Sequence, residues 1–436
     1  MWFVLVSVLA AGAVDSGAVD SSVTEPDGGG ADAGFHPHPA AASATATLSR
    51  PAGEVAEPAD AGEEDEVEAP SRLTSPPLAR VKSIAAEADL LALATKGEDG
   101  KLRAPFKGEP KVLTIDPKLQ NELEATLKLY QTPWAAVVAI EPATGRVLAM
   151  AEHSEEDPSL RGLCTQALYP AASIFKIVTA SALLGKGLAA ETQACFHGGK
   201  RKLTPDLLED GPRDSICYDL PTAMAKSANV VFAKLTAKYL SSSDLRATAK
   251  AWGFNRPLDF PVPSDVSLAG IPQDKFNLAL TGAGFGDVYL SPLHGAELAA
   301  VVANGGTWRQ PVLFEGESAA DGPRVVSGEI AGKLAEMMAG TIDSGTARRI
   351  FHERGNRLDD AVGKTGSLAD KKPFRDYTWF VGYAPRENPK VAVGAVVVND
   401  PFWRIRATWL GREAMRLYLE SLVPKKTKAV AQPPKR

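Results

Sequence analysis

Ser173 and Lys176 have the residue types and the spacing that could perform covalent chemistry. In a helix, side chains at positions i and i+3 share one face, so the lysine amine can reach the serine hydroxyl. A hydroxyl is a weak nucleophile at neutral pH, and a lysine can activate it if burial or a neighbouring cation lowers the lysine pKa. At a helix start, the serine N–H can also stabilise an oxyanion. The pair therefore indicates acyl transfer, although alone it also describes a capped helix with a surface lysine.

A second polar motif contains Ser227 and Asn229, within the run 225–232. The Ser227 hydroxyl can relay a proton, and the Asn229 amide can hold a substrate carbonyl. The alternative interpretation is a polar junction between a helix and a loop.

A third motif, formed by Lys364, Thr365, Gly366 and Ser367, precedes the β-rich run 377–383. The lysine supplies positive charge for a substrate carboxylate and for lowering other pKa values, and the two hydroxyls can bind that carboxylate. Gly366 would let substrate approach the edge-strand backbone, and the N–H of Ser367 can be a second oxyanion donor. The alternative is a β-hairpin with a solvated lysine.

Together, the three motifs have the order, and the placement on helix, loop and strand, known from penicillin-binding proteins and serine β-lactamases. Over residues 113–422 the chain resembles the penicillin-binding transpeptidase domain. Further stretches carry the same resemblance: 114–120, 139–150, 284–286, 291–293, 303–306 and 345–347.

The resemblance implies roles for the reacting groups. Ser173 would attack a D-Ala-D-Ala carbonyl of a peptidoglycan stem peptide and form an acyl-enzyme, while Lys176 takes its proton. Ser227 would pass a proton to the leaving amine, with Lys364 near by. An acceptor amine then gives cross-linking by a D,D-transpeptidase, whereas water gives D,D-carboxypeptidase action. β-Lactams would acylate the same serine, and neither a metal nor an organic cofactor is implied.

The resemblance also implies how substrate is held. The backbone N–H groups of Ser173 and Ser367 would bind the oxyanion. Asn229 would bind the peptide backbone, and Thr365 and Ser367 would receive the terminal carboxylate.

Two other functions remain open. A serine β-lactamase needs a route to deacylate, through a water activated by a glutamate or through a carboxylated lysine, typically with valine where this chain has Asn229. No glutamate stands out for the first route, and Asn229 argues against the second. A penicillin-sensing or wall-binding module could keep its acylating serine without turnover, and turnover of a D-Ala-D-Ala peptide would distinguish it.

The elements that must position these motifs indicate an α+β fold. A continuous apolar run at 135–140 predicts a buried strand, with 146–151 as its hairpin partner. Residues 171–304 are mainly helical by pattern, and 377–383 and 391–398 are β-rich. The outer strands can join one antiparallel sheet only if the helical block is a long insertion. We therefore expect an antiparallel sheet flanked by helices plus an all-helical lobe, with a cleft between them.

Flanking elements complete the expected domain. Asp116 and Pro117 predict a helix start, with the helix ending near Tyr130. A brief strand is expected at 113–115, and a final amphipathic helix at 407–422. The segment 81–112 is expected to be a linker with a short helix at 81–93 and a link at 96–111.

The two ends of the chain have a composition of their own. Residues 14–80 carry 13 acidic residues against 3 arginines, a net charge of −10 in a chain of net −5, so the remainder carries +5. We expect this acidic Ala/Pro-rich tether, and the basic tail 423–436, to be disordered. Residues 1–13 are too short for a membrane span and indicate a signal peptide or a short anchor. The protein is therefore expected to be exported, either periplasmic or associated with the outer face of the cytoplasmic membrane, and the overall charge gives no case for nucleic-acid binding.

The chain has three cysteines, Cys164, Cys195 and Cys217, and no zinc-site spacing. The segment from Cys195 to Cys217 has little apolar content and hairpin-like ends, which favours a disulfide worth about 3 kcal/mol in the chain-entropy model. Export would permit that bond. Cys164 is expected to be a small, buried, unpaired residue. Three unpaired thiols remain the alternative.

A chain that starts near Arg80 should fold and bind penicillin as the full chain does, because the acidic segment contributes no motif residue. Denaturant unfolding and penicillin binding of both chains would check this. Loss of cooperative unfolding in the shortened chain would contradict it.

Overall fold

The computed structural model describes residues 83–199, 203–317, 319 and 321–423. The signal peptide or anchor, the acidic tether and nearly all of the basic tail predicted from the sequence lie outside this part. None of the helices in the described ranges combines the length and the apolar character needed to cross a bilayer.

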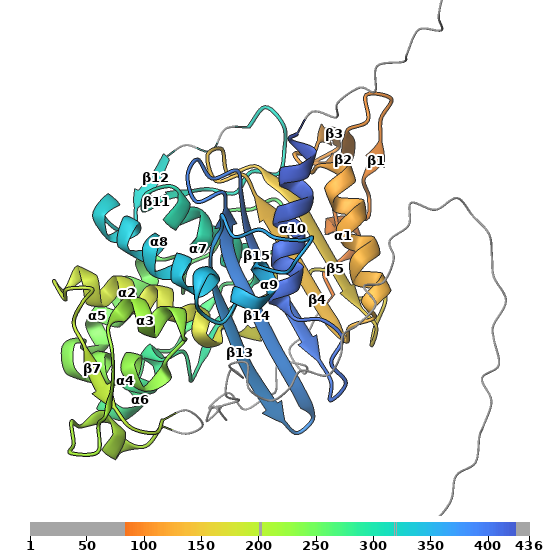
Figure 1. The fold of residues 1–436 in the computed structure, drawn as a ribbon. Coiled ribbons are helices and arrows are strands. Elements are labelled where there is room, and N and C mark those ends of the chain that lie inside the picture. Colours follow the sequence, from red (N-terminus) through yellow and green to blue (C-terminus); the bar gives the residue numbers. More distant parts are fainter. Residues whose placement is uncertain (1–82, 200–202, 318, 320, 424–436) are drawn as a thin grey trace, which may run out of the picture. The chain divides into compact units, whose positions relative to one another are not determined.

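A five-stranded antiparallel sheet forms the centre of the domain, in the order β13-β14-β15-β4-β5 (Figure 1). The strands β4 and β5 come early in the chain, whereas β13 to β15 come late. Val393 of β15 pairs with Ala139 of β4 and thereby joins the two groups. The helical block is therefore an insertion, and the α+β prediction is confirmed. The strand bounds are β4 (Trp134–Ile140), β5 (Val147–Ser154), β13 (Val362–Lys371), β14 (Phe374–Ala384) and β15 (Val391–Asn399).

Both faces of the sheet are buried, which explains the unbroken apolar run in β4. Its residues alternate between two cores: Ala136 and Val138 belong to one, and Ala135 and Val137 to the other. The first core includes the buried helix α7 (Pro292–Ala303), and the second includes α1 (Pro117–Tyr130) and α10 (Ala407–Ser421). As expected, Asp116 caps α1, accepting from two backbone N–H groups of the first turn.

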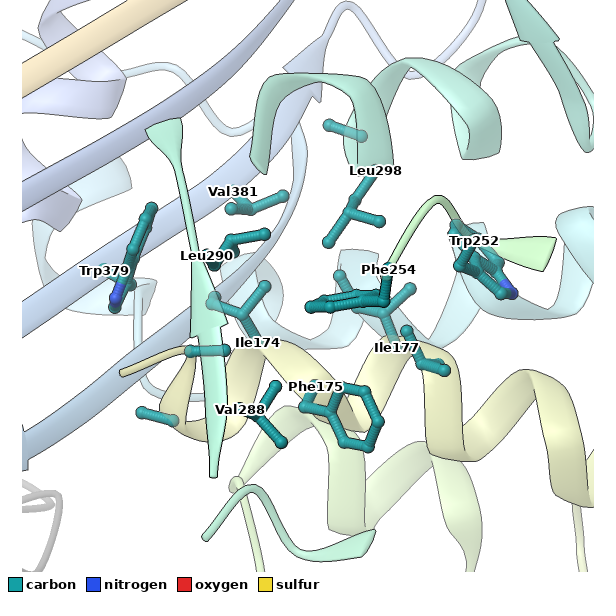
Figure 2. Close-up of a cluster of buried hydrophobic side chains, with 14 of the residues drawn as sticks. Ile174, Phe175, Ile177, Trp252, Phe254, Val288, Leu290, Leu298, Trp379 and Val381 are labelled. Carbon is teal, nitrogen blue, oxygen red and sulfur yellow. The ribbon is translucent and has the colours of Figure 1, made fainter. Parts of the chain in front are cut away.

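A helical lobe follows β5 in the chain, drawn in yellow-green to cyan in Figure 1. Its core is continuous with the core beneath α7. Figure 2 shows Ile174 and Phe175 near Phe254, with Leu298 of α7 and Val381 of β14 in the same cluster. The Phe175 and Phe254 rings meet edge to face, with 5.4 Å between their centroids. The helices of this part are α2 (Lys176–Gly185), α3 (Leu220–Ala225), α4 (Asn229–Tyr239), α5 (Ser242–Ala251), α6 (Lys275–Gly282) and α8 (Gly328–Asp343). The short helix α9 (Arg348–Phe351) packs instead in the second core, where the Phe351 ring meets Phe380 of β14.

The short elements are strand pairs and single turns of 3₁₀ helix. They are η3 (Ala172–Phe175), η4 (Pro205–Leu208), β6 (Tyr169–Pro170), β7 (Ala194–Phe196), β8 (Ile216–Tyr218), β9 (Leu268–Ala269), β10 (Val288–Leu290), β11 (Thr307–Arg309) and β12 (Asp321–Arg324).

Strands β7 and β8 pair Cys195 with Cys217, and a disulfide joins the two residues. Cys164 is free and buried, and burial raises the pKa of its thiol well above the usual range. That shift disfavours the reactive thiolate, which agrees with a structural residue.

The expectation of a linker at 81–112 needs correction. In its described part, residues 83–112, this segment contains a short 3₁₀ turn, η2 (Ala86–Ala88), followed by an antiparallel sheet of β1 (Thr95–Lys96), β2 (Leu102–Phe106) and β3 (Glu109–Val112). The two-residue turn Lys107-Gly108 adopts positive φ at both residues, as a tight hairpin requires.

Packing against the main domain orders this small sheet. The ring of Phe106 lies on Phe314, with 4.7 Å between the centroids. The strand expected at 113–115 does not form. Strand β3 ends at Val112, and the next residue, Leu113, makes a single antiparallel bridge with Phe314.

Gly394→Ala should destabilise the domain, because a Cβ at this position would lie 2.2 Å from the Pro292 carbonyl oxygen and 2.5 Å from the Ala296 nitrogen of α7. Backbone atoms cannot move away cheaply, so we expect a loss of about 1–3 kcal/mol or more in the free energy of unfolding. The matched control is Gly332→Ala on the exposed face of α8, where a Cβ meets nothing within 4 Å. That change should stabilise by about 0.5–1 kcal/mol. Denaturant unfolding measures both, and equal effects would contradict the packing argument.

Candidate functional site

Ser173 lies in the 3₁₀ turn η3, immediately before α2. The preceding Ala172 has a φ of 47°, a strained conformation for a residue with a side chain. Gly284 holds this turn from the other side: a Cβ there would lie 2.4 Å from the Ala172 carbonyl oxygen and 3.1 Å from the Ser173 Cα. The turn that carries Ser173 is therefore fixed by close backbone packing against the segment after α6.

Lys176 begins α2 and its side chain is fully buried. Its Nζ donates to Ser173 Oγ at 2.6 Å, to Asn229 Oδ1 at 2.7 Å and to the Ala283 carbonyl oxygen at 2.7 Å. The Phe232 ring lies 5.7 Å away and adds an apolar wall. Ser173, Lys176 and Asn229 are thus brought together as the sequence predicted.

This arrangement suits a lysine that exchanges a proton with the serine. As an ammonium, Lys176 has three donors for its three oxygen partners. As a neutral amine, it can keep its donations to Asn229 and Ala283 while its lone pair accepts the Ser173 hydroxyl proton. Both protonation states therefore fit the same geometry, and proton transfer requires no rearrangement.

The second motif stands at a junction between two helices. α3 ends at Ala225 and α4 begins at Asn229, so Ser227 lies in the turn with a φ of 52°. The Ala228 N–H donates to the Ala223 carbonyl at 2.8 Å and closes this turn. The polar junction between a helix and a loop, given above as the alternative interpretation of this motif, is present, and it holds Ser227 in a strained conformation.

The third motif lies in β13, the edge strand of the central sheet. Its residues pair in register with β14, with Lys364 opposite Val381. Lys364 is fully buried, and its Nζ donates to Ser227 Oγ at 2.9 Å and to the Thr365 carbonyl at 2.7 Å. The solvated-lysine alternative is therefore wrong, and Lys364 connects the second motif to the third.

The remaining residues of this motif have distinct surroundings. Thr365 is buried, with its hydroxyl 2.5 Å from that of Thr346, and Ser367 is half-buried. For Gly366 the structure gives a different reason than substrate approach. A Cβ there would lie 3.2 Å from Cγ1 of Ile174 and 3.3 Å from Cβ of Trp379, so glycine lets β13 lie close to the turn that carries Ser173.

Two polar groups of this site were missed by sequence reasoning: the Ala283 carbonyl and the Thr346 hydroxyl. Each lies in or beside a stretch that carried the family resemblance, 284–286 and 345–347, for which no role was assigned. Among the residues that the structure describes, no group of three or more His, Cys, Asp or Glu side chains could hold a metal ion.

Comparison with protein families places this geometry in context. The model of the penicillin binding protein transpeptidase domain matches residues 135–408. The peptidoglycan D,D-transpeptidase PbpA of Mycobacterium tuberculosis is 29% identical over 347 residues, covering 68% of each chain. The peptidoglycan D,D-transpeptidase MrdA of Haemophilus influenzae is 25% identical over 398 residues, covering 74% of this chain and 59% of that protein.

Solved structures show the same likeness. Penicillin-binding protein A from M. tuberculosis, as an imipenem acyl-enzyme complex, has a TM-score of 0.58 at 26% identity over 70% of this chain and 79% of the other. Its penicillin G acyl-enzyme complex has a TM-score of 0.57 at 26% identity over 71% and 79%. The D,D-transpeptidase domain of a peptidoglycan glycosyltransferase from Eggerthella lenta has a TM-score of 0.60 at 22% identity over 75% and 95%, a likeness of fold.

Asn229→Asp should move any Lys176-dependent acylation of Ser173 to higher pH. The new carboxylate would lie beside the Lys176 Nζ, now 2.7 Å from the amide oxygen, and would hold it as an ammonium. We expect the rising limb of the pH–rate profile for acylation by penicillin to shift up by about one to three pH units. Asn229→Ala, which removes the acceptor without adding charge, is the control. Identical profiles for the two variants would contradict the assignment of Lys176 as base.

Proposed function

Because the chain belongs to the family of penicillin-binding protein transpeptidase domains, we propose that it is a peptidoglycan D,D-transpeptidase acting through an acyl-enzyme on Ser173. One observation carries the proposal: the buried Lys176 Nζ lies 2.6 Å from the Ser173 hydroxyl and also bonds Asn229 of the second motif. Relatives named as D,D-transpeptidases, and the acyl-enzyme complexes of a structural relative, support it.

Acylation begins when Lys176 takes the hydroxyl proton and Ser173 Oγ bonds to the penultimate D-Ala carbonyl carbon. The N–H groups of Ser173 and Ser367 stabilise the oxyanion. Collapse of this intermediate breaks the C–N bond, and the leaving D-Ala amine takes a proton from Ser227. Lys364 supports this transfer, because its Nζ donates to Ser227 Oγ.

Substrate binding uses the edge of the sheet. An extended stem peptide can lie along the outer side of β13, a common mode of peptide recognition. Asn229 donates to the peptide backbone, and the hydroxyls of Thr365 and Ser367 receive the terminal carboxylate. Penicillins carry a carboxylate beside a reactive carbonyl and therefore compete for the same groups.

The acyl-enzyme then meets either an amine or water. An amine from a second stem peptide gives a cross-link, and water gives carboxypeptidase action. In either case Ser227 takes a proton from the attacking amine or water, and Lys176 returns its proton to the Ser173 oxygen as the acyl bond breaks. A β-lactamase that relies on a carboxylated lysine is disfavoured, because the Lys176 Nζ already donates to three oxygen atoms.

The substrate places this activity outside the cytoplasm. The disulfide between Cys195 and Cys217 supports export, since such bonds persist in oxidising compartments. Residues 1–13 would direct this export or anchor the protein to the outer face of the cytoplasmic membrane, and the protein would then work in the periplasm or at that membrane.

Fluorescent penicillin should label the protein at Ser173, and Ser173→Ala should abolish the labelling without changing the unfolding transition. Lys176→Arg, which keeps the charge but stays protonated, should slow acylation by about 10²-fold or more. Mass mapping of the labelled peptide identifies the site, and release of D-Ala with incorporation of an acceptor amine measures transpeptidation. Persistent labelling of the alanine variant at another serine would overturn the assignment.

A further inference from the structure

Thr346 lies between α8 and α9 and contacts elements of both the second and the third motif. Its hydroxyl is 2.5 Å from the Thr365 hydroxyl in β13. Its backbone N–H donates to the Ala225 carbonyl at the end of α3, two residues before Ser227, at 3.1 Å. One residue therefore connects the turn that carries Ser227 with the strand that carries Thr365.

The position of Thr346 is fixed by close backbone packing. A Cβ at Gly345 would lie 2.1 Å from the Ala225 carbonyl oxygen, so glycine is needed for this approach. The Ala347 N–H donates to the Thr341 carbonyl at 3.0 Å. Asp343, the last residue of α8, is held by an ion pair with Arg386. The Thr346 hydroxyl is thus presented to Thr365 by a well-anchored segment.

The direction of the bond between the two threonines follows from the chemistry of a bound carboxylate. A hydroxyl has one proton to donate and two lone pairs, whereas a carboxylate only accepts. If the Thr365 proton goes to a carboxylate, the proton between the threonines must come from Thr346. Accepting that bond strengthens the donation from Thr365, because linked hydrogen bonds polarise one another.

We propose that Thr346 is a positioning residue that directs the Thr365 hydroxyl to donate to the terminal carboxylate, so that preference for an anionic ligand depends on Thr346. This inference rests on the proposed function, since it requires a carboxylate-bearing acyl donor at Ser173. It adds a specificity determinant outside the three motifs, and Thr346 itself need not touch the substrate.

The test compares acylation of the full-length protein by penicillin G and by its methyl ester, which lacks the anionic group. Thr346→Val removes the hydroxyl and keeps the branched shape. We expect its second-order acylation rate constant to fall roughly tenfold for penicillin G and to change less than about twofold for the ester, because only the acid has a carboxylate whose hydrogen bond from Thr365 is weakened when Thr346 no longer directs and polarises that donor. Thr346→Ser should keep the wild-type preference for the acid.

Two further variants sharpen the measurement. Thr126→Val in α1 removes a hydroxyl that donates only to a carbonyl of its own helix, Glu122 O at 2.7 Å, and should leave both rate constants unchanged. Thr346→Val combined with Thr365→Val should be no worse toward penicillin G than Thr365→Val alone, because Thr346 acts through Thr365. Should the valine variant unfold, Thr346→Ala provides the same removal of the hydroxyl.

The outcomes distinguish the role of Thr346 from the proposed acyl-transfer function. Equal losses for acid and ester in Thr346→Val, or additive losses in the double variant, would overturn the role of Thr346 while leaving the acyl-enzyme intact. Failure of the wild-type protein to react with either penicillin would overturn the proposed function itself.

Discussion

The amine of Lys176 lies out of contact with solvent, so its hydrogen-bonding capacity must be satisfied inside the protein. Its partners come from three places: Ser173 in η3, Asn229 at the first position of α4, and Ala283 directly after α6. The Lys176 nitrogen therefore connects three segments of the helical lobe: η3, the start of α4 and the end of α6. A hydrogen bond to a charged group typically contributes about 1.5–3 kcal/mol, so this nitrogen restrains the elements around it.

A second buried lysine extends the same constraint to the sheet. The side chain of Lys364 extends from the edge strand β13 and donates to Ser227, so it joins the sheet to the helical lobe. Close packing at three glycines makes these bonds possible: Gly284 lies against the turn that carries Ser173, Gly345 against the end of α3, and Gly366 against Ile174. The arrangement of these side chains thus depends on three contacts that no larger residue would permit without displacement.

The sequence predicted what local pattern determines, and it missed what depends on contacts distant in the chain. The apolar run of β4 and the capped start of α1 were correctly predicted, because burial and capping leave direct compositional signs. The small sheet at 95–112 was missed, because its turn, Lys107-Gly108, lacks the usual Asn-Gly signal and its stability comes from Phe314. The Ala283 carbonyl was also missed, since any residue type offers a backbone oxygen.

The strained backbone conformations of Ala172 and Ser227 are held in place by the rest of the fold. Among the described residues, non-glycine positive φ occurs mostly in turns and helix caps such as Lys107 and Gln131, yet Ala172 and Ser227 adopt it beside and within the reacting groups. Such conformations cost about 1–3 kcal/mol each and persist only where surrounding structure over-determines them. A sheet buried on both faces, continuous with the core beneath η3, supplies that rigidity. Placing both serines where the helical lobe meets the sheet therefore lets a stable core hold two strained turns in reach of their lysines.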